Sequence, residues 1–374
     1  MIRPRGPAAL AFRIVQSPAA RLVDCVFEVE GPRMIGREPG AGGLVIEDKK
    51  MSSRHCTIDI GPLGELVYRD EKSKNGSFLD GVKTSAGRLP DGAVLRIGST
   101  LLVATRRGPD GPVDDPAHDL VGASPAFRTV CAAAIAAAEH DDPLVLAGEP
   151  GVEVEALARL VHRRGRGADG GPFVAVDCAV LDAARAPSEL FGPTGKVRAA
   201  HGGTLFLDEV GALDAASQAA LLQVLEKKCI PGQNPKRPTP VDVRVVAALY
   251  PEVATAMTTG HFRTDVYARL ATHMINVPPL RERREDILRL VRFHAGLTAG
   301  QPLFENEAAE QALLYAWPEN RRELRQFVMR IAAKRRPLAQ SDLPKTVLPG
   351  QTPLAPREPI VNNEALHRAV RGGS

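Results

Sequence analysis

Residues 202–210 read GGTLFLDEV, and this stretch indicates the fold of the larger part of the chain. A short apolar run, TLFL, follows two glycines and ends in two carboxylates, Asp208 and Glu209. Similar apolar runs occur on both sides of it, at PLVLAGE, FVAVDCAVL, VDVRVVAAL and HMINVPPL, with Ala-rich helical segments between them. This alternation predicts an α/β domain in which helices cover both faces of a parallel sheet.

The chain before this domain has a different pattern. Up to residue 105, short β runs are separated by turn sequences such as GPLGE, KNG, LDG and PDG, which is typical of a β-sandwich. Residues 106–118, RRGPDGPVDDPAH, have almost no bulky apolar side chain and predict a linker. After LRERREDI the pattern is helical to about residue 345, and we expect a flexible tail beyond it.

The composition excludes several classes of protein. With 374 residues, 44% hydrophobic residues and a net charge of +4, the chain is too apolar for a disordered protein and long enough for more than one core. No apolar stretch reaches the roughly 18–20 residues of a membrane helix, and Arg13 interrupts the only N-terminal run that resembles a signal segment. Five cysteines without CxxC spacing favour reduced thiols, and hence a cytoplasmic protein, over a disulfide framework or a zinc site.

Three short motifs follow one another in the β region: GR at 36–37, SSRH at 52–55 and KNGS at 74–77. Each motif alone is common in turns. Together, in this order within the all-β region 21–105, they resemble the forkhead-associated (FHA) domain, a module that binds phosphothreonine peptides. A bound phosphate needs a fixed cation and neutral donors, and arginine, serine and asparagine supply them.

The resemblance implies a set of phosphopeptide-binding side chains in these loops. They are Arg37, Ser52, Ser53, Arg54, Lys74 and Asn75. Arg37 and Ser52 would contact the phosphate, and Asn75 would bind the peptide backbone. His55 would brace the loops, which is a structural role. We therefore expect a threonine-phosphorylated protein as a partner.

Residues 119–345 resemble the central AAA+ domain of the sigma-54-dependent transcriptional activators, the bacterial enhancer-binding proteins. The phrases that carry the resemblance, in family order, are LVGASPAF, SELFG, GGTLFLDEV, LLQVLE, FRTDVYARL, VPPLRERREDI and WPENRRELRQF. The implied organisation is an N-terminal extension at 1–20, an FHA sandwich at 21–105, a linker at 106–118, an α/β AAA+ subdomain at 119–284, a helical lid at 285–345 and a tail at 346–374.

The phosphate-binding loop of this AAA+ domain departs from the family pattern. Residues 148–155, GEPGVEVE, stand where the family has G-x-x-x-x-G-K, so that Val154 replaces the lysine and Glu153 replaces the last glycine. One change removes a cation and the other adds a carboxylate beside an anionic ligand, which costs binding free energy. We expect the affinity for ATP and Mg²⁺ to be weak or lost. The positions of this degenerate nucleotide site are Gly148, Gly151, Val154, Glu155 and Arg322.

Other family positions give a mixed picture. Asp208 and Glu209 match the acids that hold Mg²⁺ through water and polarise the attacking water, although such a pair can also simply cap a helix. We interpret them as ancestral catalytic residues without present activity, and Asp208 is the only metal ligand expected if Mg²⁺ binds. Leu249 and Tyr250 stand in place of the polar sensor that contacts the γ-phosphate in the family. Arg263 and Arg269 match the arginines that reach a neighbouring subunit's nucleotide, or they can be interface salt-bridge partners.

Two further features of the family are absent. Between SELFG and HGGTLFLDE the family inserts a loop that contacts sigma-54, whereas this chain has only PTGKVRAA at 193–200. The segment after Arg336 has room for one short helix but not for a complete helix-turn-helix, so we expect no sequence-specific DNA binding.

Three functions are compatible with these features. The first is a phosphothreonine-peptide-binding regulator whose AAA+ domain associates with related activator subunits but is not an active enzyme. The second is an active ATP-dependent sigma-54 activator, and the third is an FHA adaptor with an inert AAA+ spacer. Loss of the lysine, the polar sensor and the sigma-54 loop favours the first.

Overall fold

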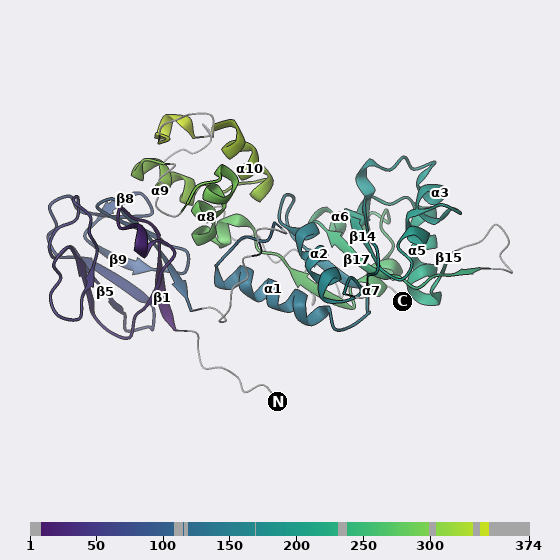
Figure 1. Ribbon diagram of the computed structural model, residues 1–374, viewed down its shortest axis with the longest axis horizontal. Coiled ribbons are helices and arrows are strands. Elements are labelled where there is room, and N and C mark those ends of the chain that lie inside the picture. Colours follow the sequence, from purple (N-terminus) through teal and green to yellow (C-terminus); the bar gives the residue numbers. More distant parts are fainter. Residues whose placement is uncertain are drawn as a thin grey trace. The chain divides into compact units, whose positions relative to one another are not determined.

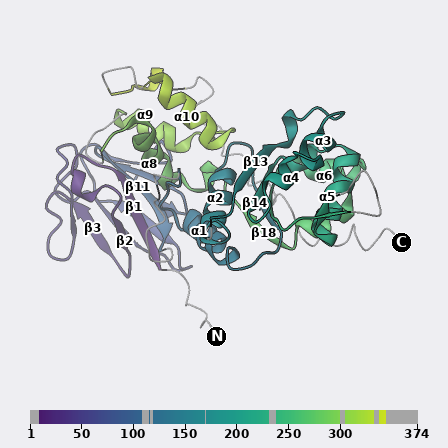
Figure 2. The same cartoon turned by 45° about the vertical axis from the view of Figure 1, so that its right-hand side comes forward.

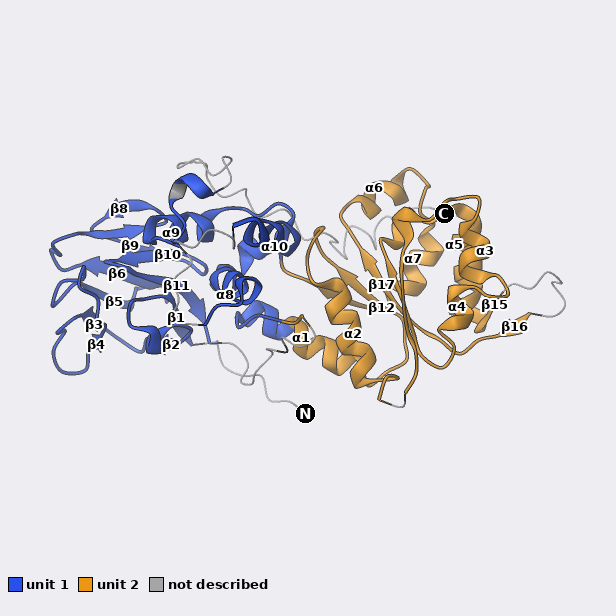
Figure 3. Cartoon of the chain, turned by 45° about the horizontal axis from the view of Figure 1, so that its top comes forward, with its two compact units in different colours: residues 1–116, 121–129, 279–355 blue, residues 117–120, 130–278, 356–374 orange. Residues whose placement is uncertain are grey.

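The computed structural model describes residues 9–107, 115, 119–168, 170–230, 238–298, 304–331 and 337–343 (Figure 1). Contacts divide the chain into two compact units (Figure 3). Unit 1 comprises residues 1–116, 121–129 and 279–355, and unit 2 comprises residues 117–120, 130–278 and 356–374. The predicted tail lies outside the described residues, as does most of the predicted linker. Among the described residues, no helix combines the length and the apolar character needed to cross a membrane.

The N-terminal part of unit 1 is a sandwich of two sheets, as predicted. One sheet has the order β2-β1-β11-β10-β7-β8 and the other has the order β4-β3-β5-β6-β9. The strands are β1 (Leu10–Gln16), β2 (Val26–Glu28), β3 (Arg33–Gly36), β4 (Leu44–Val45), β5 (Cys56–Ile60), β6 (Leu66–Asp70), β7 (Ser77–Leu79), β8 (Val82–Thr84), β9 (Ala86–Leu89), β10 (Val94–Ile97) and β11 (Thr100–Arg106). Phe12, Ile35, Ile58 and Leu102 are among the buried side chains between the sheets.

Strand β1 was not predicted from the sequence. It pairs antiparallel with β11, from Leu10 opposite Arg106 to Gln16 opposite Leu101. The charged residue that interrupts its apolar run, Arg13, is itself buried, and its guanidinium donates to the carbonyl oxygens of Asp24 at 2.8 Å and Ala123 at 3.0 Å. Its Nε has no hydrogen-bond partner among the described residues, but the carboxylates of Glu285, Asp286 and Asp24 are close enough to compensate the buried charge.

The C-terminal part of unit 1 is helical. It contains η5 (Leu280–Glu282), α8 (Arg284–Ala295), α9 (Asn306–Leu314), α10 (Asn320–Ile331) and η6 (Gln340–Asp342). Figures 1 and 2 both show α8 and α9 beside the six-stranded sheet. Side chains of β11 alternate between two cores: Leu102 faces the inside of the sandwich, whereas Leu101 and Val103 pack with the helices. The sheet is therefore covered on both faces.

Unit 2 is built on a parallel sheet, which confirms the predicted α/β fold. Its strand order is β13-β14-β17-β12-β18, with all four pairings parallel. The strands are β12 (Leu144–Ala147), β13 (Phe173–Asp177), β14 (Thr204–Asp208), β17 (Arg244–Leu249) and β18 (His273–Asn276), and a ribbon is formed by β15 (Cys229–Ile230) and β16 (Thr239–Pro240). The helices are α1 (Pro125–Ala137, whose first turn belongs to unit 1), α2 (Val154–Arg164), α3 (Ala186–Phe191), α4 (Lys196–Ala199), α5 (Ala215–Lys227), α6 (Glu252–Thr258) and α7 (Thr264–Leu270).

The strand order of unit 2 determines which loops are neighbours. Strands β12 and β14 both pair with β17, so the loops that follow these three strands meet at the carboxyl edge of the sheet. Gly148, directly after β12, donates its amide to the carbonyl oxygen of Leu249 at 3.1 Å. In parallel α/β sheets this edge is where ligands bind.

Candidate functional site

The first candidate site lies in the loops at one end of the sandwich. The segment after β3 runs beside the segment before β5, because Arg37 N donates to Ser52 O at 3.1 Å and Glu38 N donates to Ser53 O at 2.9 Å. A Cβ atom on Gly36 would collide with the carbonyl oxygen of Ser53. Only glycine therefore allows this close approach, and the approach places the side chains of Arg37 and Ser52 in adjacent loops.

The third loop joins the same site. Lys74 N donates to Ser52 Oγ at 3.0 Å, and the Asn75 side chain donates to the carbonyl oxygen of Lys50 at 2.6 Å. Gly76 has a φ of +78°, which a residue with a side chain rarely adopts. The loop containing Lys74 and Asn75 is thus held against the loop containing Ser52.

The site is rich in exposed cations. Arg37, Arg54 and Lys74 are all exposed, and Ser52 and Ser53 are half-buried between them. Arg37 uses its Nε to donate to Met51 O at 2.8 Å, while no hydrogen bond within the described residues occupies its two Nη atoms. One acid is close, since Ser53 Oγ donates to Glu38 at 3.4 Å. The arrangement offers a fixed guanidinium fork, hydroxyl groups and ammonium charge to an anion.

His55 lies beneath these loops and is fully buried. Its Nδ1 accepts a hydrogen bond from Ser52 N at 3.1 Å, and its Nε2 lies 3.9 Å from Asp70. Burial lowers the pKa of His55, although Asp70 opposes this effect, so the imidazole is neutral at physiological pH. Asp70 in turn accepts hydrogen bonds from Ser73 and Ser77, which connects the third loop to the same support.

The second candidate site is the loop after β12 in unit 2. Glu149 and Glu153 are 7% and 5% exposed, so both carboxylates of this loop are buried. Val152 and Val154 are also buried, and a Cβ on Gly148 would lie 2.7 Å from Val152 Cγ2. The loop is therefore occupied by isopropyl groups and carboxylates. It provides no cation of its own for a phosphate.

The other residues of this loop do not supply that charge. Gly151 has a φ of +82°. Glu155, in the first turn of α2, is exposed and forms an ion pair of 2.8 Å with Arg159. Glu153 stands at the N-cap position of α2 but makes no capping hydrogen bond.

The acids after β14 are arranged for a contact within the protein. Tyr250 OH donates to Asp208 Oδ1 at 2.7 Å, across the adjacent ends of β14 and β17. This hydrogen bond occupies one of the acceptor sites of the Asp208 carboxylate. Glu209 is exposed and has a φ of 52°, in the left-handed region. Within the described part of the chain, no group of three or more His, Cys, Asp or Glu side chains is arranged to hold a metal ion.

The arginines expected at a subunit interface bind acids of their own chain. Arg263 pairs with Asp265 at 2.6 Å, and Arg269 pairs with Glu226 at 3.1 Å. Arg322 is exposed on α10. Residues 193–200 contain only the short helix α4, with Val197 buried beneath it.

Comparisons with known proteins identify both parts of the chain. The model of the FHA domain matches residues 33–98, and the model of the sigma-54 interaction domain matches residues 120–276. The DNA-binding transcriptional regulator NtrC of Bradyrhizobium sp. (strain RP501 Parasponia) is 34% identical over 325 residues, which are 79% of this chain and 67% of that protein. The chain belongs to the family of sigma-54-dependent activators. Relatives in this family are transcription regulators.

Two further proteins are similar over a smaller part of the chain. The nitric oxide reductase transcription regulator NorR1 of Cupriavidus necator is 38% identical over 253 residues, 63% of this chain and 49% of that protein. NtrX of Brucella abortus, solved in complex with ATP, has a TM-score of 0.56 and 29% identity over 61% of this chain and 57% of that one. The chain thus spans about half the length of several curated relatives that it matches.

The structure adds residues that the motifs did not indicate. Asp48 is buried and accepts hydrogen bonds from the amides of Lys50 at 2.9 Å and Ser99 at 2.6 Å, so it anchors the loop that carries Ser52. Tyr250 was noted only as a lost sensor, whereas it bonds to Asp208. A buried aspartate between loop residues gives no signal in a single sequence until its amide partners are known.

Proposed function

We propose that this chain is a phosphothreonine-peptide-binding regulator whose AAA+ domain is defective in ATP hydrolysis and in contact with sigma-54. It would modulate transcriptional signalling in the cytoplasm by associating with a threonine-phosphorylated protein and with related AAA+ subunits. The observation that carries the proposal is a difference in charge: the FHA loops present arginine and lysine, whereas the AAA+ loop contains buried carboxylates and has Val154 in place of the lysine.

Phosphopeptide binding is supported by three features of the FHA loops. Arg37 has both Nη atoms available for a bidentate contact, Ser52 is hydrogen-bonded to the adjacent loop, and Asn75 is fixed at the rim. Charge-assisted hydrogen bonds to phosphate are about twice as strong as neutral ones. The loops are also braced from below by His55, so little ordering is required on binding.

Loss of nucleotide binding is supported by the AAA+ loop and the strand ends together. Glu153 and Val154 place negative charge and apolar volume where the family has glycine and lysine. Tyr250 holds Asp208, the residue that would orient magnesium-bound water. Two unlike changes, in the loop and at the sensor, lower the affinity for the same ligand.

The principal alternative is an active ATP-dependent sigma-54 activator. Asp208 and Glu209 are retained at the end of β14, and the relative NtrX of Brucella abortus was solved with ATP. Calorimetry with Mg²⁺ and ATP on the full chain separates the two functions. We expect no binding at micromolar ATP, and micromolar affinity accompanied by turnover would contradict the proposal.

The second alternative is an FHA adaptor whose AAA+ domain is an inert spacer. It differs from the proposal only in that its AAA+ domain binds no related subunit. An inert spacer would leave the chain monomeric at micromolar concentration and unable to retain an intact activator of the family. A regulator that acts by association would retain it. Sedimentation of the full chain with and without such an activator distinguishes these outcomes.

Phosphopeptide titration tests the first half of the proposal. The full chain would be titrated with a peptide pool centred on phosphothreonine with randomised flanks, and with the same pool unphosphorylated. We expect Arg37→Ala to lower the affinity for the phosphorylated pool by 100-fold or more, roughly 3 kcal/mol, because one guanidinium makes two charge-assisted hydrogen bonds to the phosphate. The matched control is Arg88→Ala, an exposed arginine of β9 paired with Glu65. Equal affinity for wild type and Arg37→Ala would refute phosphate capture at these loops.

A further inference from the structure

The FHA sandwich and the C-terminal helices of unit 1 share one buried core. Val15, Val94, Leu101 and Val103 project from β1, β10 and β11 into the same apolar cluster as side chains of α8 and α9. The helical members include Leu290, Val291, Ala308, Ala312 and Leu313. We call this contact between the three strands and the two helices the joint. Continuous burial of this kind makes the two parts one packed body and not two domains joined by a tether.

Polar contacts fasten the joint from both sides. Arg96 of β10 donates its Nε to Glu310 of α9 at 2.8 Å, and both side chains are largely buried. Gln16 donates to Asn306, the first residue of α9, at 3.1 Å. Arg292 of α8 contacts both carboxylate oxygens of Asp24 at 3.0 Å. A buried, hydrogen-bonded ion pair is sensitive to small displacements, because separation leaves its charges without partners.

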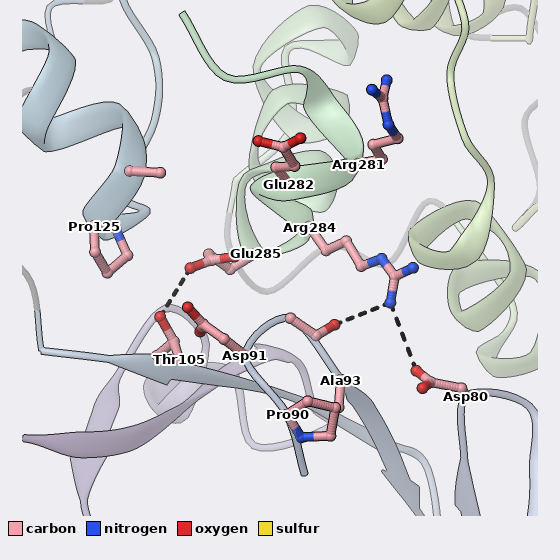
Figure 4. A pocket seen from close by; sticks show the side chains of 12 residues that line it. Asp80, Pro90, Asp91, Ala93, Thr105, Pro125, Arg281, Glu282, Arg284 and Glu285 are labelled. Atoms are coloured by element: carbon pink, nitrogen blue, oxygen red, sulfur yellow. Dashed lines mark hydrogen bonds and ion pairs between the residues drawn. The ribbon is translucent and has the colours of Figure 1, made fainter. Parts of the chain in front are cut away.

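A polar cavity of about 500 Å³ lies at the α8 side of the joint (Figure 4). Arg284 donates to the carbonyl oxygen of Gly92 at 3.1 Å and lies 3.7 Å from Asp80, while Thr105 donates to Glu285 at 2.9 Å. The α8 side of the joint thus has a cavity and polar contacts next to the apolar core that both helices share.

A chain of hydrogen bonds connects the phosphopeptide loops to this joint. Asn75 donates to Lys50 O at 2.6 Å, and Lys50 N donates to Asp48 at 2.9 Å. Asp48 also accepts from Thr100 Oγ1 at 3.2 Å, and Thr100 is the first residue of β11. The next residue, Leu101, is part of the joint. Three residues, Lys50, Asp48 and Thr100, therefore connect Asn75, the side chain expected to bind the peptide, to Leu101 in the joint.

A second connection starts from the same threonine. Thr100 Oγ1 lies 3.1 Å from Ser17 Oγ, and the residue before Ser17 is Gln16, which bonds to Asn306 at the start of α9. Thr100 has no exposed surface, so water cannot replace these contacts. The phosphopeptide loops and α9 are consequently both connected to the buried hydroxyl group of Thr100.

We propose that phosphopeptide binding in the FHA loops and the seating of α8 and α9 on the sandwich are thermodynamically coupled. This inference rests on the proposed phosphopeptide function. A peptide that binds Asn75 and the loop of Ser52 favours the conformation in which Asp48 and Thr100 are ordered, and that conformation also orders β11 and α9. A ligand stabilises the state that it binds, and the effect is reciprocal between the two sites.

Hydrogen exchange of the full chain measures the effect of the loops on the lid. With the phosphothreonine peptide pool at saturation, we expect the amides of α9 and β11 to exchange about 5-fold or more slowly, within the range of ordinary coupling. The unphosphorylated pool, and the Arg37→Ala chain with the phosphorylated pool, should leave these amides unchanged. Thr100→Val should still bind the pool but lose most of the protection at α9. The matched control is Thr84→Val, the same substitution in β8 of the same sheet, which has no place in the joint.

The reciprocal measurement starts from the lid. Glu310→Gln removes the buried charge partner of Arg96. It should lower the affinity for the phosphothreonine peptide pool several-fold, although Glu310 lies outside the phosphopeptide loops. Glu319→Gln, an exposed acid of the lid, should have no effect on peptide affinity.

The outcomes separate the coupling from the function on which it rests. If the pool binds, Arg37→Ala abolishes binding, and neither α9 exchange nor the Glu310→Gln affinity changes, the coupling is wrong and the phosphopeptide function stands. If the pool does not bind wild type at all, the phosphopeptide function is wrong and the coupling fails with it. Slower exchange at α9 together with weaker binding by Glu310→Gln supports both.

Discussion

The FHA loops and the loop after β12 are the two places where the family resemblance puts a phosphate, and they differ in the sign of their charge. Each follows a buried strand, and each has a glycine in close contact with its neighbours, Gly36 in one and Gly148 in the other. At the FHA site the side chains beside the glycine include exposed Arg37 and Lys74. At the AAA+ site they are buried Glu149 and Glu153. The two loops thus share a close approach of the backbone but present side chains of opposite charge.

The position of the carboxylates differs as well. In the FHA domain, Asp48 and Asp70 lie behind the loops and accept hydrogen bonds from the loops' own amides and hydroxyls. In unit 2 the carboxylates are in the loop itself, and Asp208 is held by Tyr250. A carboxylate in the loop itself lies closer to a bound anion than one behind the loop, so its repulsion is stronger.

Repair of the AAA+ loop should produce the largest effect. The triple variant Glu153→Gly, Val154→Lys and Tyr250→Asn restores a glycine, a cation and a polar sensor, and it releases Asp208. We expect Mg²⁺ and ATP to bind at least 100-fold more tightly than to wild type, roughly 3 kcal/mol, because the variant gains an ammonium at position 154 and loses the repulsive carboxylate at position 153. Calorimetry measures the difference.

The control for this repair adds the same charge one residue further on. Glu155→Lys makes the same net change in charge at the last position of the loop sequence, on the exposed first turn of α2, and it should gain little affinity. Equal gains from Glu155→Lys and the triple variant would mean that net charge, and not loop geometry, limits nucleotide binding.

Substitution of Gly36 should damage the FHA site through its backbone. Gly36→Ala places a Cβ against the carbonyl oxygen of Ser53, so the strands that carry Arg37 and Ser52 must separate. Overpacking of this kind costs about 1–3 kcal/mol. We expect a lower melting temperature and roughly 10-fold weaker binding of phosphothreonine peptides. Gly31→Ala, whose Cβ meets no atom within 4 Å, is the matched control, and similar losses in both variants would argue against a special role for Gly36.

The sequence was sufficient to predict the parallel sheet, because its strands are buried on both faces and read as uninterrupted apolar runs such as TLFL and RVVAAL. It was not sufficient for β1. Arg13 looks like a break in an apolar run, and its acceptors at Asp24 and Ala123 become neighbours only after folding. A local sequence pattern indicates which residues are buried, but it does not identify the distant residues that they contact.

The same limit applies to the joint and to the candidate sites. The run TLLVAT in β11 indicates burial on both faces, but nothing near it in sequence indicates that Leu101 would pack against helices about 200 residues later. Motif order was enough to nominate Arg37, Ser52 and Asn75, which the structure places in adjacent loops. The contact between Tyr250 and Asp208 joins residues 42 positions apart, so no local pattern indicates it.

The stability of unit 1 should fall as the pH rises, because Glu285, which is buried at the joint, keeps its proton in the folded chain. Burial raises the pKa of Glu285 to about 7, and the neighbouring Asp286 adds to the increase, while Thr105 and Arg13 oppose it. The folded chain therefore keeps this proton up to about pH 7, whereas the unfolded chain releases it near its ordinary pKa of 4.5. This contribution to stability is present at pH 4.5 and is lost as the pH rises to about 7.

Glu285→Gln tests this effect. Glutamine keeps the shape and stays neutral, so the variant should lose less stability than wild type between pH 5 and pH 8, by on the order of 2 kcal/mol. Thermal unfolding at a series of pH values measures the slope. Glu282→Gln, an exposed carboxylate of the same cavity, should retain the wild-type slope. An unchanged slope in Glu285→Gln would show that this carboxyl group is already ionised in the folded chain.

The smallest expected effect separates the two roles of Tyr250. Tyr250→Phe removes the 2.7 Å hydrogen bond to Asp208 but keeps the aromatic ring in place. If the phenol stabilises the carboxylate, the free energy of unfolding of the variant should be about 1 kcal/mol lower than that of wild type, as is usual for the loss of one such hydrogen bond. It should gain no affinity for ATP, because Glu153 and Val154 still occupy the loop. Tighter ATP binding by Tyr250→Phe alone would instead show that the phenol, and not the acidic loop, is what keeps nucleotide out, and the contrast in charge between the two phosphate sites would then lose its functional meaning.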